Sequence, residues 1–386
     1  MSISTARPSS AAVVPLADAL DLGPVVWDEL LGRAGTPGPF MTWAWHRAWA
    51  EGAEADAVDS ARVVVLRSAA GEVEALFPFR VYRTRFRRVP VVALGWAIGD
   101  LGCPDYLELP AAPEADLDAL VGALDEVPWD VIVLSNVADG AANIDRFAAA
   151  CERRGWKALR TPLWRCPYLE LPASWDTYLS RASPSRRQTI RWTERKLRRE
   201  HQVALSEYGV ERFDDGWRHL ARLHGLRWGG AGVFREPGWE RLHRSFASWL
   251  AGRRQLWLST LDVDGTPVAA WYGFSFADTV YYYQSGWDPQ WERRSVGMIL
   301  TGAMIRCAIE RHYGRFDFLR GTEPHKMAWT STVRTCFEIV VIRPGWRGAA
   351  LRGLDWIATR RAAGWLRPRT DWFRHVRGQE LDRGLT

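Results

Sequence analysis

Residues 260–274 read TLDVDGTPVAAWYGF, which is the pattern of a β-hairpin. Two runs rich in apolar residues flank an Asp-Gly pair, and such a pair between strands is a strong signal for a tight turn. Residues 65–79 read VLRSAAGEVEALFPF and share the plan of a strand, a turn with a glycine and a second strand ending in aromatic residues. The two stretches lie half the chain apart. They therefore predict two copies of one α/β unit.

The segments around both hairpins alternate between helical and strand-like periodicity, which predicts an α/β protein with mixed α+β sheets. Before the first hairpin we expect an amphipathic helix over residues 40–53, with Thr42 as its N-cap. After the second hairpin we expect a strand over residues 279–286 and a helix over residues 296–313. We divide the chain into a disordered tail, two similar halves and an Arg- and Trp-rich tail, over residues 1–14, 15–172, 173–343 and 344–386.

The composition is that of an ordinary globular protein, and 386 residues suit two domains. No stretch approaches the roughly 18 apolar residues of a membrane span, and the N-terminus lacks the features of a secretion signal. The five cysteines are widely spaced and form no C-x-x-C pair. We therefore expect a cytoplasmic protein without a disulfide framework or a bound metal. A net charge of +6 suits a phosphorylated ligand, an RNA or an anionic membrane surface and does not choose among them. We do not expect DNA as a partner.

The loop before the helix at residue 296 has the features of an anion-binding site. A turn that leads into a helix exposes backbone N–H groups, and the helix dipole adds partial positive charge. Such a site suits the pyrophosphate of a cofactor. The alternative is an ordinary strand-to-helix connection. The residues that we expect to bind the cofactor are Arg293, Arg294, Ser295, Val296, Gly297 and Met298.

The loop over residues 320–329, RGTEPHKMAW, follows a predicted strand end and concentrates ionisable groups. Ligands of α/β sheets bind outside the carboxyl ends of strands. Glu323 could act as a base, and Lys326 could stabilise an oxyanion. The alternative is a solvated turn in which Arg320 and Glu323 form a surface pair. Only three of the 51 basic residues are lysines, which favours a specific use for the ammonium group of Lys326.

A basic helix is predicted over residues 184–200, with a stripe of arginines at helical spacing. The stripe could hold the phosphates of a nucleotide sugar or of tRNA, or it could be a solvated face paired with nearby glutamates. Tyr283 and Gln284 could line a cleft, because alternate strand positions face opposite sides. The residues that we expect on the substrate side are Tyr106, Arg187, Arg191, Arg227, Tyr283, Gln284, Arg320 and Gly321.

Several segments occur in an order that resembles a known family. They read CPYLELPASWDTYLSRASPSRRQTIRWTERKL, LHGLRW, VAAWYGF, YYYQSGWD, RRSVGMILTGAMIRCAIE and FDFLRGTEPHKMAW. Together with the segment FMTWAWHRAWAEGA they look like the BioF2-like or CelD-like acetyltransferases, a branch of the GNAT superfamily related to the Fem aminoacyltransferases. The resemblance covers roughly residues 38–343.

This resemblance implies a tandem GNAT fold and transfer of an acyl group from acyl-CoA, such as acetyl-CoA, to an amine in polysaccharide or cell-envelope biosynthesis. It implies a role for Lys326 at the reaction centre and for Asp105 as a base. Two positions depart from the family pattern. Ile299 stands where the phosphate-loop signature Gln/Arg-x-x-Gly-x-Gly/Ala has its second small residue, and His325 replaces the usual tyrosine before the lysine.

Three functions remain open from the sequence. The first is an N-acyltransferase acting on an amino sugar or another small amine or envelope precursor. The second is a Fem-like aminoacyltransferase whose donor is aminoacyl-tRNA. The third is a catalytically silent binding protein of polysaccharide assembly. The departure at Ile299 leaves the donor undecided between the first two.

Overall fold

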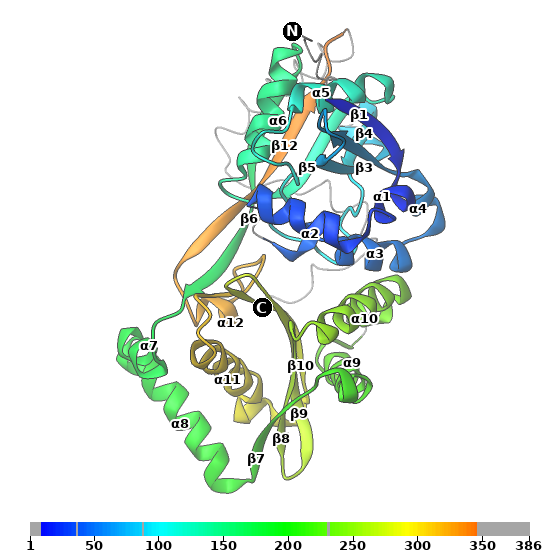
Figure 1. The fold of residues 1–386 in the computed structure, drawn as a ribbon. Coiled ribbons are helices and arrows are strands. Elements are labelled where there is room, and N and C mark those ends of the chain that lie inside the picture. The colour runs from blue at the N-terminus through cyan, green and yellow to red at the C-terminus, as the bar shows by residue number, and fades with distance from the viewer. Residues whose placement is uncertain (1–8, 36–37, 87–88, 230–231, 346–386) are drawn as a thin grey trace.

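The computed structural model describes residues 9–345 apart from the gaps at 36–37, 87–88 and 230–231 (Figure 1). Within these residues, twelve strands form one sheet in the order β1-β2-β3-β4-β5-β12-β6-β11-β10-β9-β8-β7. The strands of the first half are β1 (Ser10–Pro15), β2 (Ala61–Arg67), β3 (Val73–Phe86), β4 (Val89–Trp96), β5 (Val131–Val137) and β6 (Lys157–Glu170). Those of the second half are β7 (Val203–Glu207), β8 (Leu256–Val263), β9 (Thr266–Phe276), β10 (Thr279–Trp287), β11 (Arg315–Asp317) and β12 (Val333–Ile342).

Each half of the described chain also holds six α-helices. The first half holds α1 (Leu16–Leu20), α2 (Gly23–Ala34), α3 (Trp43–Gly52), α4 (Ala55–Ser60), α5 (Leu117–Gly122) and α6 (Ala142–Arg153). The second half holds α7 (Trp175–Arg181), α8 (Pro184–Glu200), α9 (Phe213–Trp228), α10 (Pro237–Gly252), α11 (Val296–Glu310) and α12 (Pro324–Met327). In Figure 1, α9 and α10 lie on one face of the second sheet half and α11 on the other, with α8 outside α11. None of the described helices is both long enough and apolar enough to cross a membrane.

The pairing of the strands confirms the two similar halves. In the first half, β1 to β4 are antiparallel neighbours and β5 joins β4 in parallel. In the second half, β7 to β10 are antiparallel neighbours and β11 joins β10 in parallel. The hairpins predicted from residues 65–79 and 260–274 are β2–β3 and β8–β9, at matching positions of the two copies.

The last strand of each half is exchanged with the other half. β6 pairs with β11 of the second half, and β12 pairs with β5 of the first half. The two exchanged strands also pair with each other, and Figure 1 shows them side by side between the halves. The exchange joins both sheets into one. The boundary that we set at residue 172 follows the chain order and remains a prediction.

Several sequence expectations need correction. Residues 10–14, which we expected in a disordered tail, form most of β1 and pair with β2. The helix expected over residues 40–53 begins at Trp43, and Thr42 is its N-cap as expected, since its hydroxyl accepts from the Trp45 amide at 3.2 Å. Most of the Arg- and Trp-rich tail, residues 346–386, lies outside the described residues.

Helices α3 and α10 pack against each other and bring both halves into one apolar core. The ring centroids of Trp45 on α3 and Phe246 on α10 lie 4.8 Å apart. Gly52 and Gly238 lie where the two backbones meet, and a Cβ atom on either would collide with the backbone oxygen of the other. This close approach requires glycine at both positions.

Buried charges join the first half to the end of β11. Asp105, which is 1% exposed, accepts from the backbone amide and Nε of Arg320 at 3.0 and 2.7 Å. Asp317 is fully buried and accepts from the Tyr106 hydroxyl at 2.9 Å, while Arg334 forms an ion pair with it. Because a buried carboxylate is stable only when paired, these contacts fix the start of the loop that follows β11.

Candidate active site

Strands β10 and β11 separate at the centre of the second half. They pair in parallel only over residues 279–281 and 315–317. Beyond this point, the pairing of β10 with β9 shifts register between Tyr282 and Gln284, which marks a bulge at Tyr283. Among the described residues, β10 therefore has no strand partner on the β11 side beyond Tyr281. The chain then passes through the short helix η6 (Pro289–Arg294) into α11.

A cavity of about 250 Å³ lies where α11 begins. Four of the six residues predicted to bind a cofactor line it, namely Ser295, Val296, Gly297 and Met298. The first α11 amide that bonds back along the chain is that of Ile299, which donates to the Ser295 carbonyl at 3.0 Å. The amides of the three residues before it belong to the first turn, where a helix offers them no internal acceptor. These amides could donate to an anion in the cavity.

The two predicted arginines of this loop behave differently from the four lining residues. Arg294 forms an ion pair with Glu200 at the end of α8. Neither Arg294 nor Arg293 lines the cavity. Both arginines precede α11 in the sequence, but neither contributes to the cavity at its N-terminus.

The wall formed by β10 carries Tyr282, Ser285 and Trp287. The hydroxyls of Tyr282 and Ser285 lie 2.5 Å apart, and Arg227 donates to the Ser285 hydroxyl at 2.9 Å. The guanidinium of Arg227 also lies 3.4 Å from the ring centroid of Trp287. Burial raises the pKa of Tyr282, so its phenol keeps its proton at neutral pH. Arg227 was predicted on the substrate side, and the structure places it directly behind this wall.

The wall opposite comes from α12 and the residues after it, and it includes His325 and Trp329. Burial lowers the pKa of His325 to about 4, and the charges of Arg227 and Lys326 act in the same direction. The imidazole is therefore neutral at pH 7. We did not select His325 from the sequence, although it replaces a family tyrosine beside Lys326.

Lys326 follows His325 and lies mostly buried, with 13% of its side chain exposed. Its ammonium donates to the Arg320 carbonyl at 2.5 Å and lies 3.1 Å from Glu323. Burial favours the protonated form of Glu323, but Lys326 and a backbone hydrogen bond outweigh this and hold its pKa below the ordinary value. Glu323 is thus an ionised partner of Lys326, which favours a positioning role over that of a base.

Six further predicted residues do not line the cavity, and most of them lie in the seam between the halves. Asp105 holds Arg320, which also places the backbone carbonyl that Lys326 contacts. Tyr106 is buried against Arg334, whose guanidinium lies 3.6 Å from its ring centroid. Tyr283 is the bulge residue and donates to the Gly102 carbonyl across the seam. The other two are Gln284, which bonds to His224, and Gly321, whose φ is +101°.

Part of the outward stripe of α8 is paired with acids. Arg191 lies 3.4 Å from Asp176, and Arg198 lies 3.2 Å from Glu194. These contacts agree with a solvated face. Arg187 is half-buried and pairs with no acid among the described residues, whereas its neighbour Arg186 turns inward and lines the cavity.

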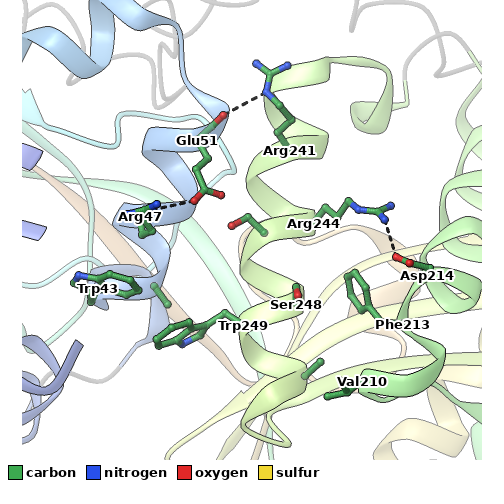
Figure 2. A pocket seen from close by; sticks show the side chains of 13 residues that line it. Trp43, Arg47, Glu51, Val210, Phe213, Asp214, Arg241, Arg244, Ser248 and Trp249 are labelled. Atoms are coloured by element: carbon green, nitrogen blue, oxygen red, sulfur yellow. Dashed lines mark hydrogen bonds and ion pairs between the residues drawn. The ribbon is translucent and has the colours of Figure 1, made fainter. Parts of the chain in front are cut away.

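A second, more open groove of about 910 Å³ lies between α3 and α10 (Figure 2). Its charged groups already have partners. Arg47 lies 2.9 Å from Glu51, Arg244 lies 2.6 Å from Asp214, and Arg241 donates to the Glu51 carbonyl at 3.3 Å. The arginines that line the groove are therefore engaged within the protein. No cluster of three or more side chains suited to a metal lies among the described residues.

The sequence of the second half has a counterpart in a known family. Residues 184–327 match the sequence model of a family described as an acetyltransferase (GNAT) domain. The GNAT match runs from α8 to α12 and so includes the separated strands and the start of α11. It supports an acyltransferase in the second half of the chain. The first half lies outside the match. None of the curated proteins matches the chain.

Solved structures of distant proteins share the whole architecture. The C-terminal domain of a putative lysylphosphatidylglycerol synthetase from Agrobacterium fabrum matches with a TM-score of 0.51 and 10% identity, over 88% of this chain and 96% of that one. FemX matches with a TM-score of 0.53 and 10% identity, over 82% and 95%. A conserved protein of unknown function from Bacteroides thetaiotaomicron VPI-5482 matches with a TM-score of 0.53 and 11% identity, over 84% and 98%. At such identities the comparison shows the fold alone.

Proposed function

We propose that the protein transfers an acyl group from acyl-CoA, such as acetyl-CoA, to an amine acceptor. One observation carries the proposal. A single cavity opens both on the first turn of α11, which suits the pyrophosphate of the donor, and on His325 of α12, where the acyl group would react. The pyrophosphate and the thioester of one donor would then occupy its two ends.

The lining residues suit the chemistry of acyl transfer. The acceptor amine must lose a proton, and the neutral imidazole of His325 can accept it, directly or through water. As the C–N bond forms, the thioester oxygen gains negative charge. Lys326 does not itself line the cavity. Its ammonium contacts Arg320 and Glu323 among the described residues, and its third N–H would stabilise that charge once the thioester lies beside it. When the C–S bond breaks, the phenol of Tyr282 can donate a proton to the leaving thiolate.

We assign Asp105 to positioning rather than to proton transfer. Its carboxylate binds Arg320 through two hydrogen bonds, and the Arg320 carbonyl in turn contacts Lys326. The proposed acceptor class, an amine in polysaccharide or envelope synthesis, rests on the family resemblance, and the proposed cytoplasmic location rests on the cysteine pattern and the N-terminal sequence.

A second donor, aminoacyl-tRNA, is favoured by one observation. Ile299 is buried at the position where the phosphate-loop signature has a small residue, which weakens the case for CoA. The outward arginines of α8 would then contact the RNA backbone.

Isothermal titration with acetyl-CoA separates the two donors. We expect saturable binding of acetyl-CoA at one site per chain. A filter-binding assay with charged tRNA should show at most weak association. Tight binding of charged tRNA that falls steeply with salt, with no heat from acetyl-CoA, would replace the first donor by the second.

A further inference from the structure

Arg186 occupies an inward position of the basic helix α8. The buried residues of α8 are Ile190, Thr193 and Leu197, at the spacing of one helical face. Arg186 stands one turn before Ile190 on the same face. The exposed arginines of the helix lie on other faces. A guanidinium therefore enters the interface between α8 and α11, where it lines the cavity.

Two nitrogens of this guanidinium are buried without a hydrogen-bond acceptor among the described residues. They are Nε and Nη2. The third nitrogen, Nη1, lies 3.5 Å from the sulfur of Met298, which is a weak acceptor, and the guanidinium lies 4.6 Å from the ring centroid of Trp329. Burial lowers the pKa of Arg186, and no carboxylate among its described neighbours opposes this shift. The residue as a whole is only partly buried, but two N–H groups that are shielded from solvent and have no acceptor among the described residues are costly, so the arrangement lacks a partner.

The chemistry of the missing partner follows from which nitrogens are free. Nε–H and Nη2–H form one edge of the planar guanidinium, and this edge binds two oxygens of a phosphate in parallel. The first-turn amides of α11 open on the same cavity. An arginine edge and a helix terminus on one cavity match the two charged groups of a diphosphate.

Arg294, which supplies the arginine of the phosphate-loop signature, is paired with Glu200 at the other end of α8. We infer that Arg186 takes the place of Arg294 as the side chain that binds a diphosphate in this cavity. The inference rests on the proposed function only for the identity of the donor, because the free guanidinium edge is a feature of the structure itself. Glu292 also lines the cavity, and its negative charge opposes anion binding, so a substitution of Glu292 gives a second test.

The test is isothermal titration of the full chain with inorganic pyrophosphate and, separately, with CoA. Arg186→Met keeps much of the side-chain stem against Trp329 and removes the charge. We expect it to weaken binding of both probes at least tenfold. Arg199→Met removes the same charge from an exposed position of α8, with 77% of the side chain exposed, and should change both affinities less than twofold. Glu292→Gln should tighten binding of pyrophosphate.

Folding of the variant is checked by thermal unfolding. Because Arg186→Met removes two buried N–H groups that have no acceptor among the described residues, its melting temperature should equal or exceed that of the wild type. Binding of pyrophosphate within twofold of wild type by a folded Arg186→Met, or no binding of pyrophosphate by the wild type, overturns the inference. Binding of pyrophosphate that depends on Arg186, without binding of CoA, supports the inference and rejects acyl-CoA as the donor.

Discussion

Replacing Lys326 by Met is expected to lower kcat about a hundred- to a thousandfold, the usual cost of losing a group that stabilises charge in the transition state. KM should change little, because the ammonium acts on charge that is absent from the bound substrate. The structure supports this by burying the ammonium beside the Arg320 carbonyl and Glu323, next to the residue that lines the cavity. Steady-state kinetics with acetyl-CoA and an accepted amine measure both constants.

Two further variants make this result interpretable. Lys326→Arg should rescue poorly, since a planar guanidinium does not replace a compact ammonium at a half-enclosed position. Lys157→Met, on the exposed first residue of β6, should leave kcat at the wild-type level. If Lys326→Met folds and turns over at near the wild-type rate, Lys326 is a structural lysine of the loop.

Gly297→Asp should lower the affinity for the donor by at least a factor of ten, which corresponds to about 1.4 kcal/mol. The substitution places a negative charge in the first turn of α11, where the donor pyrophosphate would lie. It also introduces a Cβ atom about 2.9 Å from the Trp287 ring, so that the indole has to shift. Titration with acetyl-CoA measures the effect.

The steric and electrostatic parts of this effect can be separated. Gly297→Ala introduces the same Cβ atom without the charge and should weaken binding less than Gly297→Asp. Gly32→Asp places an aspartate in α2, at a position with open space around the Cβ, and should not change the affinity. An unchanged donor affinity in folded Gly297→Asp would move the pyrophosphate away from α11.

The repeated fold could be predicted because its signals are local. The Asp-Gly turn at Asp264-Gly265 and the alternation of apolar residues around it specify a hairpin without reference to the rest of the chain. The exchange of β6 and β12 could not be predicted in this way. A strand has the same residue pattern whichever half supplies its neighbour. The local sequence therefore does not show which distant segment the strand pairs with. β1 was missed for a related reason, since its short segment is a strand only because β2 pairs with it.

The candidate site was predicted in part. The helix terminus at Gly297 was found because a turn leading into a helix is visible in sequence. Arg187 was chosen from α8 by charge spacing, whereas the cavity receives Arg186. The spacing of Ile190 and Leu197 identifies the buried face of the helix, and this pattern would have selected Arg186. Asp105 and Tyr106 lie in the seam because of contacts with Arg320 and Asp317, which are distant in sequence.

The donor site at the N-terminus of α11 is best tested by a crystal structure of the protein with acetyl-CoA, because that structure shows where the donor lies. We predict the pyrophosphate within hydrogen-bond distance of the amides of Val296, Gly297 and Met298, with the thioester near His325. We also predict Arg186 in contact with a phosphate oxygen. Acetyl-CoA bound in the first half or in the groove between α3 and α10, with the cavity at α11 empty, would contradict these predictions.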